Sequence, residues 1–344
     1  MKELDFDRKR LLSKVGSVAQ LAHITPFTYT SGSADGVKGF MASNGTGLDF
    51  TVLESKCLDI ISMKYKGINL NFLPKSGIVS SALSDMEGTE FLRSICGGMM
   101  YTCGLLNVGA GCMEGDMDQP FHGRMKNTPA EHVSTFCDWD GDAFVLRISG
   151  EMRESALFND NLLMRRSIET KAGKRCVTIC DVIENQGFET QELMLLYHVN
   201  VGYPILDAGA RFVAPIVSTE ARQDGVSEKG IKDYAVITEP VQGFVEQVYV
   251  HKVTEGRAAI INDELGLGLY VKYDADMLPN LIEWKSMGCG DYAFGIEPAT
   301  CLGRGRAYER SHGKFQKIAP FEKLTYTIEI GVLDGPEEIS AFTS

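Results

Sequence analysis

Short strand-like runs separated by turn-forming residues are the feature that most constrains the fold of this chain. The runs are rich in β-branched and aromatic residues, as strands are. Examples are "GLDFTVLESKCLDIISMKY" (47–65), "AFVLRISGEM" (143–152), "KRCVTICDVIEN" (174–185) and "LTYTIEIGVL" (324–333). Turn formers such as "NGTG", "WDGD" and "KAGK" lie between them, and helical signal is confined to residues 8–22 and 85–98. This rhythm predicts an all-β sandwich or barrel with a few short helices.

The domain organisation follows from length and from the lack of boundary signals. The chain has 344 residues, of which 44% are hydrophobic and 23% charged, and large β-sandwiches of this size fold as one unit. We find no internal repeat, low-complexity tract or Pro/Ser-rich linker, so residues 1–344 are expected to form a single domain. The glycine-rich runs lack the spacing of a dinucleotide or phosphate-binding loop, and we expect no cofactor.

Charge and cysteine usage limit the partners. The net charge is −12 and the pI is about 5.1, without a Lys/Arg cluster that could follow a phosphate backbone, so nucleic acid is not an expected partner. The segment "MKELDFDRKRLLSK" lacks the apolar core of a signal peptide, and no long apolar run predicts a membrane span. A cytoplasmic protein is the expectation. Nine cysteines without a CxxC pair favour reduced thiols over a structural zinc site.

The stretch "QPFHGRMKNTPAEH" (119–132) carries the first candidate site residues, His122 and Arg124. Alternate side chains of a strand share a face, so an extended conformation would place both on one polar face. That face could donate a proton and hold a polar ligand. A solvated surface strand would explain the same pattern.

Two further segments add a histidine and a carboxylate. In "ELMLLYHVNVGYPILDAG", alternation places His198 on an apolar strand, where it is either a functional group or a core histidine bonded to a carbonyl. In "DYAFGIEPATC", Gly295 and Ala293 share a face with Glu297 and leave room above the sheet. A carboxylate in an apolar strand is costly to bury without a partner, which favours a functional role.

Six segments together carry a resemblance to a known family: "GLDFTVLESKCLDI", "CGGMMYTCGLLNVGAG", "FHGRMKNTPAE", "LLYHVNVGYPILD", "EWKSMGCGDYAFGIEPATC" and "IAPFEKLTYTIEIGVLDG". The chain resembles the aldose 1-epimerase, or galactose mutarotase-like, superfamily, in a poorly characterised branch. The resemblance implies a β-supersandwich whose open face binds a sugar. It matches His198 to the histidine that protonates the ring oxygen, His122 to the second active-site histidine and Glu297 to the base.

The chemistry of anomer exchange suits these residue types. A base must remove the proton of the C1 hydroxyl while an acid protonates the ring oxygen, giving an open-chain aldehyde that recloses after rotation. A carboxylate and an imidazole can fill both roles and exchange them in the reverse step. The reaction needs no metal, nucleotide or covalent intermediate.

Four other residues are candidates for binding the sugar. Arg124 could grip hydroxyls or an anionic substituent, although an ordinary salt bridge explains it as well. Asp207 could accept from hydroxyls, but its position before Ala-Gly is typical of a turn. Lys56 stands in "LESKCLDI" where relatives often carry Arg, which would replace a bidentate grip by a point charge, and Asp59 is expected in the same patch.

His251 is a weaker binding candidate, in "VEQVYVHKV". Together with Glu246 it could form a metal site or supply an additional acid, but the two would face opposite sides of a regular strand. The leading hypothesis is therefore a sugar mutarotase. The alternatives are an epimerase or isomerase acting at another carbon, with or without a metal, and a non-catalytic carbohydrate-binding protein. Whether the protein forms a homodimer is left open.

Overall fold

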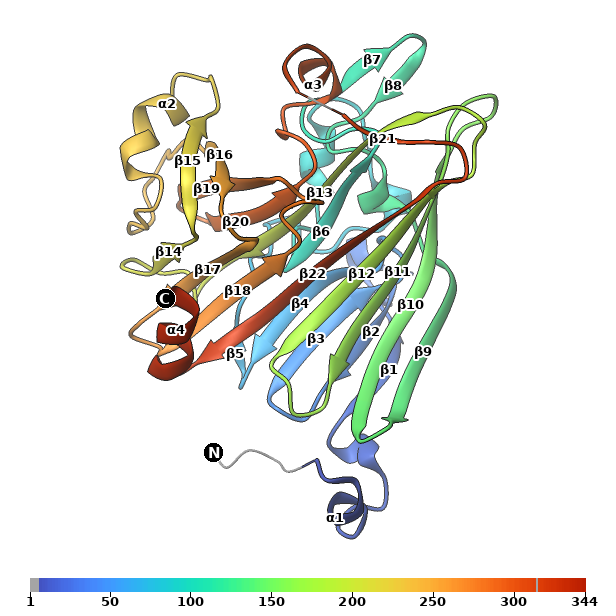
Figure 1. The fold of residues 1–344 in the computed structure, drawn as a ribbon, viewed down its shortest axis with the longest axis vertical. Helices are drawn as coiled ribbons and strands as arrows, with labels where there is room; N and C mark the ends of the chain where they lie inside the picture. Colours follow the sequence, from blue (N-terminus) through green and yellow to red (C-terminus); the bar gives the residue numbers. More distant parts are fainter. Residues whose placement is uncertain (1–5, 314) are drawn as a thin grey trace.

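Two large antiparallel sheets dominate the computed structural model, which describes residues 6–313 and 315–344 (Figure 1). Within these residues the larger sheet has the strand order β1-β2-β3-β4-β6-β13-β20-β19-β16-β15, with β5 added to β4 and β21 to β13. Its strands are β1 (His23–Thr28), β2 (Lys38–Ser43), β3 (Leu48–Leu53), β4 (Asp59–Tyr65), β5 (Ile68–Asn69), β6 (Met100–Leu105), β13 (Gln191–Val201), β15 (Ile216–Ala221), β16 (Gln247–Val253), β19 (Asn280–Gly288), β20 (Asp291–Ala299) and β21 (Gln316–Ile318).

The smaller sheet has the order β14-β17-β18-β22-β12-β11-β10-β9. Its strands are β9 (Glu131–Asp140), β10 (Ala143–Ser155), β11 (Asn161–Lys171), β12 (Cys176–Asn185), β14 (Arg211–Val213), β17 (Arg257–Asn262), β18 (Leu267–Tyr273) and β22 (Lys323–Asp334). A separate hairpin joins β7 (Cys112–Glu114) to β8 (Met117–Gln119). The sequence-predicted strand runs all lie in these sheets.

The helices are short. They are α1 (Arg8–Leu12), α2 (Ser227–Gly230), α3 (Arg306–His312) and α4 (Pro336–Thr343), with 3-10 turns η1 (Val18–Gln20), η2 (Gly32–Ala34), η3 (Ser81–Leu83), η4 (Glu90–Arg93), η5 (Met125–Asn127) and η6 (Ile231–Asp233). The predicted all-β class with a few short helices is confirmed. A search of the described residues finds no helix long and apolar enough to cross a membrane.

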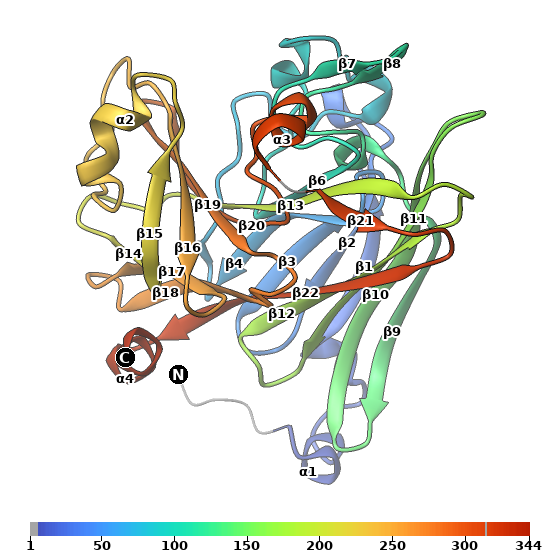
Figure 2. The same ribbon diagram turned by 45° about the horizontal axis from the view of Figure 1, so that its top comes forward.

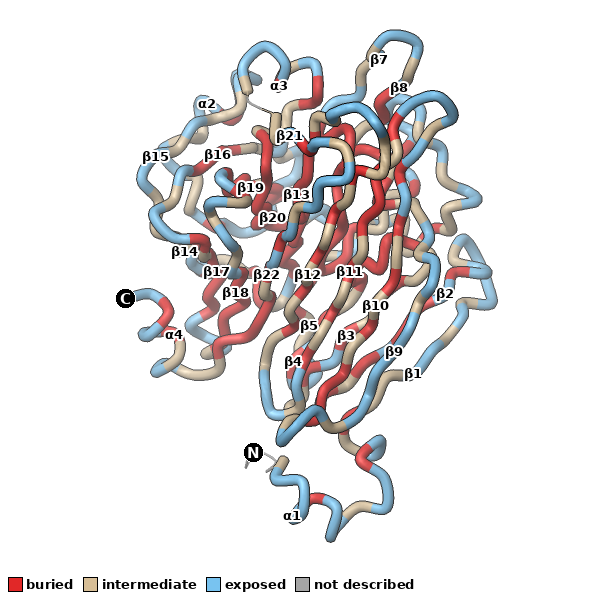
Figure 3. The backbone as a smooth tube through the Cα atoms, turned by 45° about the vertical axis from the view of Figure 1, so that its right-hand side comes forward, coloured by how far each residue is buried: buried red, intermediate tan, exposed pale blue. Residues whose placement is uncertain are grey.

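The main core lies between the two sheets, because each sheet turns alternate side chains inward. Ile179 on β12 and Ile330 on β22 meet Tyr197 and Val199 on β13 in one buried cluster. Figure 3 shows buried residues along the strands of both sheets and exposed residues in many of the connections. Residues of β13 that alternate with Tyr197 and Val199 must therefore point to the outer face of the larger sheet.

A buried ion network joins the sheets. Arg166 on β11 donates to both carboxylate oxygens of Asp181, at 2.8 and 2.6 Å, and to Asp59 at 2.8 Å. The Tyr197 hydroxyl donates to Asp181 at 2.8 Å. Hydrogen bonds on every side compensate for burying these charges.

The outer face of the larger sheet carries a second apolar cluster, which includes Leu196 and Ile282. Long connections lie over this face, and Figure 2 shows α3 beside the β7–β8 hairpin. Arg306 and Arg310 of α3 both form ion pairs with Glu114 of β7. These pairs connect the two covering segments.

Candidate functional site

A histidine and a glutamate face each other across two neighbouring strands of the larger sheet. The register of β13 and β20 pairs Leu196 with Ala299 and Val199 with Ile296, which places His198 opposite Glu297. His198 Nε2 lies 3.0 Å from Glu297 Oε1. Both side chains point to the outer face, and both residues are buried, with 6% and 3% of their surface exposed. The alternation predicted from the sequence therefore brings an acid/base pair together.

Aromatic rings enclose His198. Tyr101 of β6 pairs with it across the sheet and stacks on its ring at 4.4 Å between centroids. Trp284 of β19 stands 5.5 Å away and the His122 ring 5.9 Å away, both steeply inclined. A site with such walls excludes water, which strengthens electrostatic interactions inside it.

The His122 segment is a turn, so the predicted strand with His122 and Arg124 on one face is wrong. His122 and Gly123 adopt left-handed backbone conformations, with φ of 57° and 72°, and Gly123 N donates to the carbonyl of Pro120. Beyond β8 an isolated bridge joins Gly123 to Gly104, and Lys126 Nζ holds the turn by donating to the carbonyls of Phe121 and Gly123. This turn places the His122 ring next to His198, a position that the alternation of side chains along a strand does not predict.

Burial sets the proton preferences of the three groups. It raises the pKa of Glu297 well above its usual value, with a smaller contribution from the charge of Glu246. Burial also lowers the pKa of His198 to about 3 and that of His122 well below its usual value. All three groups therefore favour their neutral forms in the closed site.

Two buried atoms of the pair lack a hydrogen-bond partner among the described residues: Glu297 Oε1 and His198 Nδ1. The 3.0 Å contact between the side chains is close, but its alignment does not make a hydrogen bond. Buried polar atoms are nearly always paired, so these two atoms make the pair a candidate site for binding polar groups.

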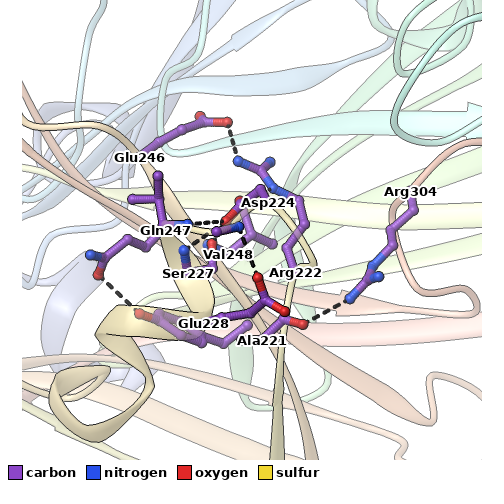
Figure 4. A network of polar contacts seen from close by, with 12 residues as sticks. Ala221, Arg222, Asp224, Ser227, Glu228, Glu246, Gln247, Val248 and Arg304 are labelled. Atoms are coloured by element: carbon purple, nitrogen blue, oxygen red, sulfur yellow. Dashed lines mark hydrogen bonds and ion pairs between the residues drawn. The ribbon is translucent and has the colours of Figure 1, made fainter.

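A charged rim lies beside the pair and begins at Trp284, whose Nε1 donates to Glu246 Oε2 at 2.7 Å. Figure 4 shows the next part of this rim, in which Arg222 pairs with Glu246 at 3.0 Å and with Asp224 at 2.6 Å. Arg304 points toward the same network and donates to the carbonyl of Ala221 at 3.0 Å. These contacts fix the Trp284 indole against His198.

Lys56 and Asp59 have different surroundings. Lys56 Nζ donates to Asn127 Oδ1 at 2.6 Å and lines a pocket that includes Tyr101. The Asp59 carboxylate also borders this pocket, but it accepts from Thr102 N and Oγ1 at 3.0 and 2.7 Å and from Arg166 at 2.8 Å. Its hydrogen bonds belong to the network between the sheets.

Arg124 and Asp207 make local contacts. Arg124 donates to the carbonyl of Asp118 at 2.5 Å and lies 3.8 Å from Glu154, a buried acid whose pKa desolvation raises to about 7. Asp207 lies in the loop after β13, where its carboxylate accepts from Ala208 N at 2.8 Å. That contact matches the turn interpretation, and no contact connects either residue with the His198 pair in the described chain.

His251 lies on the opposite face of the sheet. Strand pairing sets it beside Leu281, while Ile282 is the residue that faces Glu297. His251 Nε2 is 3.0 Å from Glu283 in the core between the sheets, and both are fully buried. The structure therefore brings His122, His198 and Glu297 together and separates His251 from them. No group of three metal-ligating side chains occurs in the described chain.

Sequence reasoning missed Tyr101, Trp284 and Lys126, and it considered Glu246 only as a partner of His251. Tyr101 stands in "GGMMYTCG" and Trp284 in "LIEWKSMG", where alternation alone would have placed each on one face of a strand. Which strands become neighbours of β13 is not visible in either segment. The pairing of β6 with β13 and of β19 with β20 is what turns these aromatics into walls of the site.

Comparisons with known proteins agree with this architecture. A family model described as "Domain of unknown function (DUF4432)" matches residues 34–332. No curated protein matches the sequence. Among solved structures, 72 chains resemble this fold.

The first of these structures is a Klebsiella pneumoniae protein named as a candidate aldose 1-epimerase, with 24% identity, a TM-score of 0.88, and coverage of 93% of this chain and 85% of that one. A galactose mutarotase-like protein from Clostridium acetobutylicum has 14% identity and a TM-score of 0.63, over 92% and 99% of the two chains. Galactose 1-epimerase from Lactobacillus acidophilus has 12% identity and a TM-score of 0.61, over 92% and 100%. The predicted mutarotase-like fold is confirmed.

Proposed function

We propose that this chain, which belongs to the DUF4432 family, is an aldose 1-epimerase that interconverts the anomers of a sugar by general acid/base catalysis. The observation that carries the proposal is the buried pair of His198 Nε2 and Glu297 Oε1, 3.0 Å apart on the outer face of the larger sheet. Names of solved structures with the same fold, such as galactose 1-epimerase, support the reaction class.

The proposed cycle begins with a proton transfer inside the pair. In the closed site both groups favour their neutral forms, so one proton resides on Glu297. Moving it across the 3.0 Å contact gives a carboxylate and an imidazolium. The carboxylate then takes the proton of the C1 hydroxyl while the imidazolium protonates the ring oxygen, and the C1–O5 bond breaks.

Ring closure reverses these roles. After rotation about C1–C2, the ring oxygen attacks the other face of the aldehyde, gives its proton back to His198, and the new C1 hydroxyl recovers a proton from Glu297. An imidazolium with a lowered pKa is a strong acid and a carboxylate with a raised pKa a strong base, which favours both transfers. His122 stands perpendicular to His198 at 5.9 Å and positions the sugar at the second edge of the site.

Anomer exchange, followed by NMR over a panel of aldoses, tests the proposal. We expect wild type to accelerate the exchange above the spontaneous rate and His198→Gln to lose that acceleration. His251→Gln is a matched control, because His251 is also buried and also 3.0 Å from a glutamate, but on the opposite face. Saturable binding without exchange would identify a carbohydrate-binding protein instead, and a new sugar in the spectrum would identify epimerisation at another carbon.

A further inference from the structure

A narrow pocket adjoins the histidine site on the far side of Tyr101. It is lined by Lys56, Asp59, Phe91, Tyr101, Lys126 and Asn127, together with the segment 94–97. These residues come from the connection between β3 and β4, from η4, from β6 and from η5. The pocket is therefore built from covering segments and from the sheet itself.

Two of its rings also touch the histidines. Tyr101 stacks on His198 at 4.4 Å and stands 6.2 Å from the His122 ring, while Phe91 lies 6.4 Å from His122. One aromatic layer thus separates the pocket from the proposed reacting centre. The pocket and the proposed reacting centre therefore share the rings of Tyr101 and Phe91.

Two ammonium groups border this pocket, and both lysines are buried, with 2% and 7% of their surface exposed. The Lys56 ammonium donates to Asn127 Oδ1 at 2.6 Å and to Ser84 Oγ at 3.5 Å, and the Lys126 ammonium donates to two carbonyls. All of these acceptors are neutral, and each ammonium has three donors. Within the described residues no carboxylate lies within salt-bridge distance of either.

This arrangement is unusual, because buried charges are normally paired. Asp59 borders the pocket but is already engaged by Arg166 and Thr102. Burial lowers the pKa of Lys56, and it lowers the pKa of Lys126 to about 8, with Lys56 contributing by its like charge. Asp59 and Glu154 act on these lysines only from beyond salt-bridge distance. Two buried cations without a contacting carboxylate leave a place where an anion would be stabilised.

We propose that the pocket binds an anionic substituent of the substrate, a carboxylate or a phosphate, with Lys56 and Lys126 as its ligands. The inference rests on the proposed function, whose substrate class it narrows from aldoses in general to sugar acids or sugar phosphates. Lysine supplies a point charge with rotatable donors, which suits either oxyanion.

The test compares glucose, glucuronate and glucose 6-phosphate in anomer exchange and in direct binding by calorimetry. Lys56→Met removes the charge and keeps most of the side-chain volume. Lys171→Met is a matched control, because Lys171 is an exposed lysine at the end of β11 in the smaller sheet. Lys126→Met is a second variant only, because Lys126 also holds the turn that carries His122.

We expect an anionic sugar to bind more tightly than glucose and Lys56→Met to weaken that binding by about 10- to 100-fold, the effect of losing one hydrogen bond to a charged group. The loss in Lys56→Met should be about tenfold or more larger for the anionic sugar than for glucose, and every constant of Lys171→Met should stay within about threefold of wild type. Whether glucuronate or glucose 6-phosphate shows the effect identifies the anion as carboxylate or phosphate.

The outcomes separate this inference from the proposed function. Equal use of neutral and anionic sugars, unchanged in Lys56→Met, would overturn the anion pocket and leave the epimerase standing. Tight binding of an anionic sugar that depends on Lys56, without exchange of any sugar, would overturn the epimerase and support the pocket. An absence of both exchange and lysine-dependent binding would overturn both.

Discussion

Replacing Glu297 with Gln tests the proposed base directly. A positioned acid/base group contributes about 10²- to 10⁴-fold to a rate, or about 3–5 kcal/mol of transition-state stabilisation. Glu297 is the acid/base partner 3.0 Å from His198, so we expect kcat to fall by that factor. The fold should survive, because Gln has nearly the same volume and its amide can donate to the imidazole; we expect the free energy of unfolding to change by about 1 kcal/mol or less.

The assay is anomer exchange by NMR or polarimetry, corrected for the spontaneous rate, on protein whose unfolding midpoint is measured in parallel. Glu283→Gln is the matched control. Glu283 is a buried carboxyl on the neighbouring strand β19 whose pKa burial also raises, but it faces the core between the sheets. The control should keep kcat within about threefold.

The pH profile gives a second readout of the same variant. The proposed cycle needs the one proton that the pair holds on Glu297, and burial raises the pKa of Glu297, so kcat/KM should fall as pH rises through that raised value. An active Glu297→Gln variant would refute the reasoning, as would an equal loss in Glu283→Gln. A loss of kcat accompanied by unfolding would leave Glu297 a structural residue.

Three further predictions concern stability and positioning. Burial lowers the pKa of His251 to about 4, so its neutral form stabilises the fold above about pH 6.5 and this stabilisation is lost as pH falls. Between pH 7 and 5, the free energy of unfolding of His251→Gln, measured in urea, should therefore decrease by about 2 kcal/mol less than that of wild type. Parallel pH profiles of the two proteins would contradict this. Gly295→Ala would push its methyl group against the carboxylate of Glu297, the proposed base. We expect kcat/KM to fall by about tenfold or more in a steady-state assay, and an unchanged value would show that the position of this carboxylate is not critical. Asp59→Asn weakens the buried network around Arg166, so denaturant titration should show a free energy of unfolding lower by about 3 kcal/mol, with KM unchanged. A raised KM in a variant of unchanged stability would instead make Asp59 a sugar ligand.

The fold was largely predictable from the sequence, because alternation and turn residues are local properties. The same alternation places His198 and Glu297 each on one face of its strand, and the register of β13 and β20 brings these two faces together. The neighbour relations of strands are not local. Tyr101 and Trp284 enter the site only because β6 and β19 lie on either side of the central pair of strands.

The His122 segment shows where the local rule fails. A left-handed residue followed by a glycine produces a turn, yet the letters around it also fit an extended strand. The turn is stabilised by the ammonium of Lys126, only a few residues further along the chain, which donates to the carbonyls of Phe121 and Gly123. Long buried side chains that bind backbone carbonyls leave no periodic pattern in a sequence.

The position of β13 in the larger sheet has a consequence for how the protein reaches its active form. Its two partners along the sheet, β6 and β20, are both far from it in sequence, and neither is joined to it by a hairpin. Contacts between distant segments form late and slowly, because the entropy cost of closing a long loop comes before the contact stabilises the chain. His198 and Glu297 can therefore meet only after most of the chain has been synthesised and folded, and catalytic activity should return during refolding in step with the slowest tertiary signal.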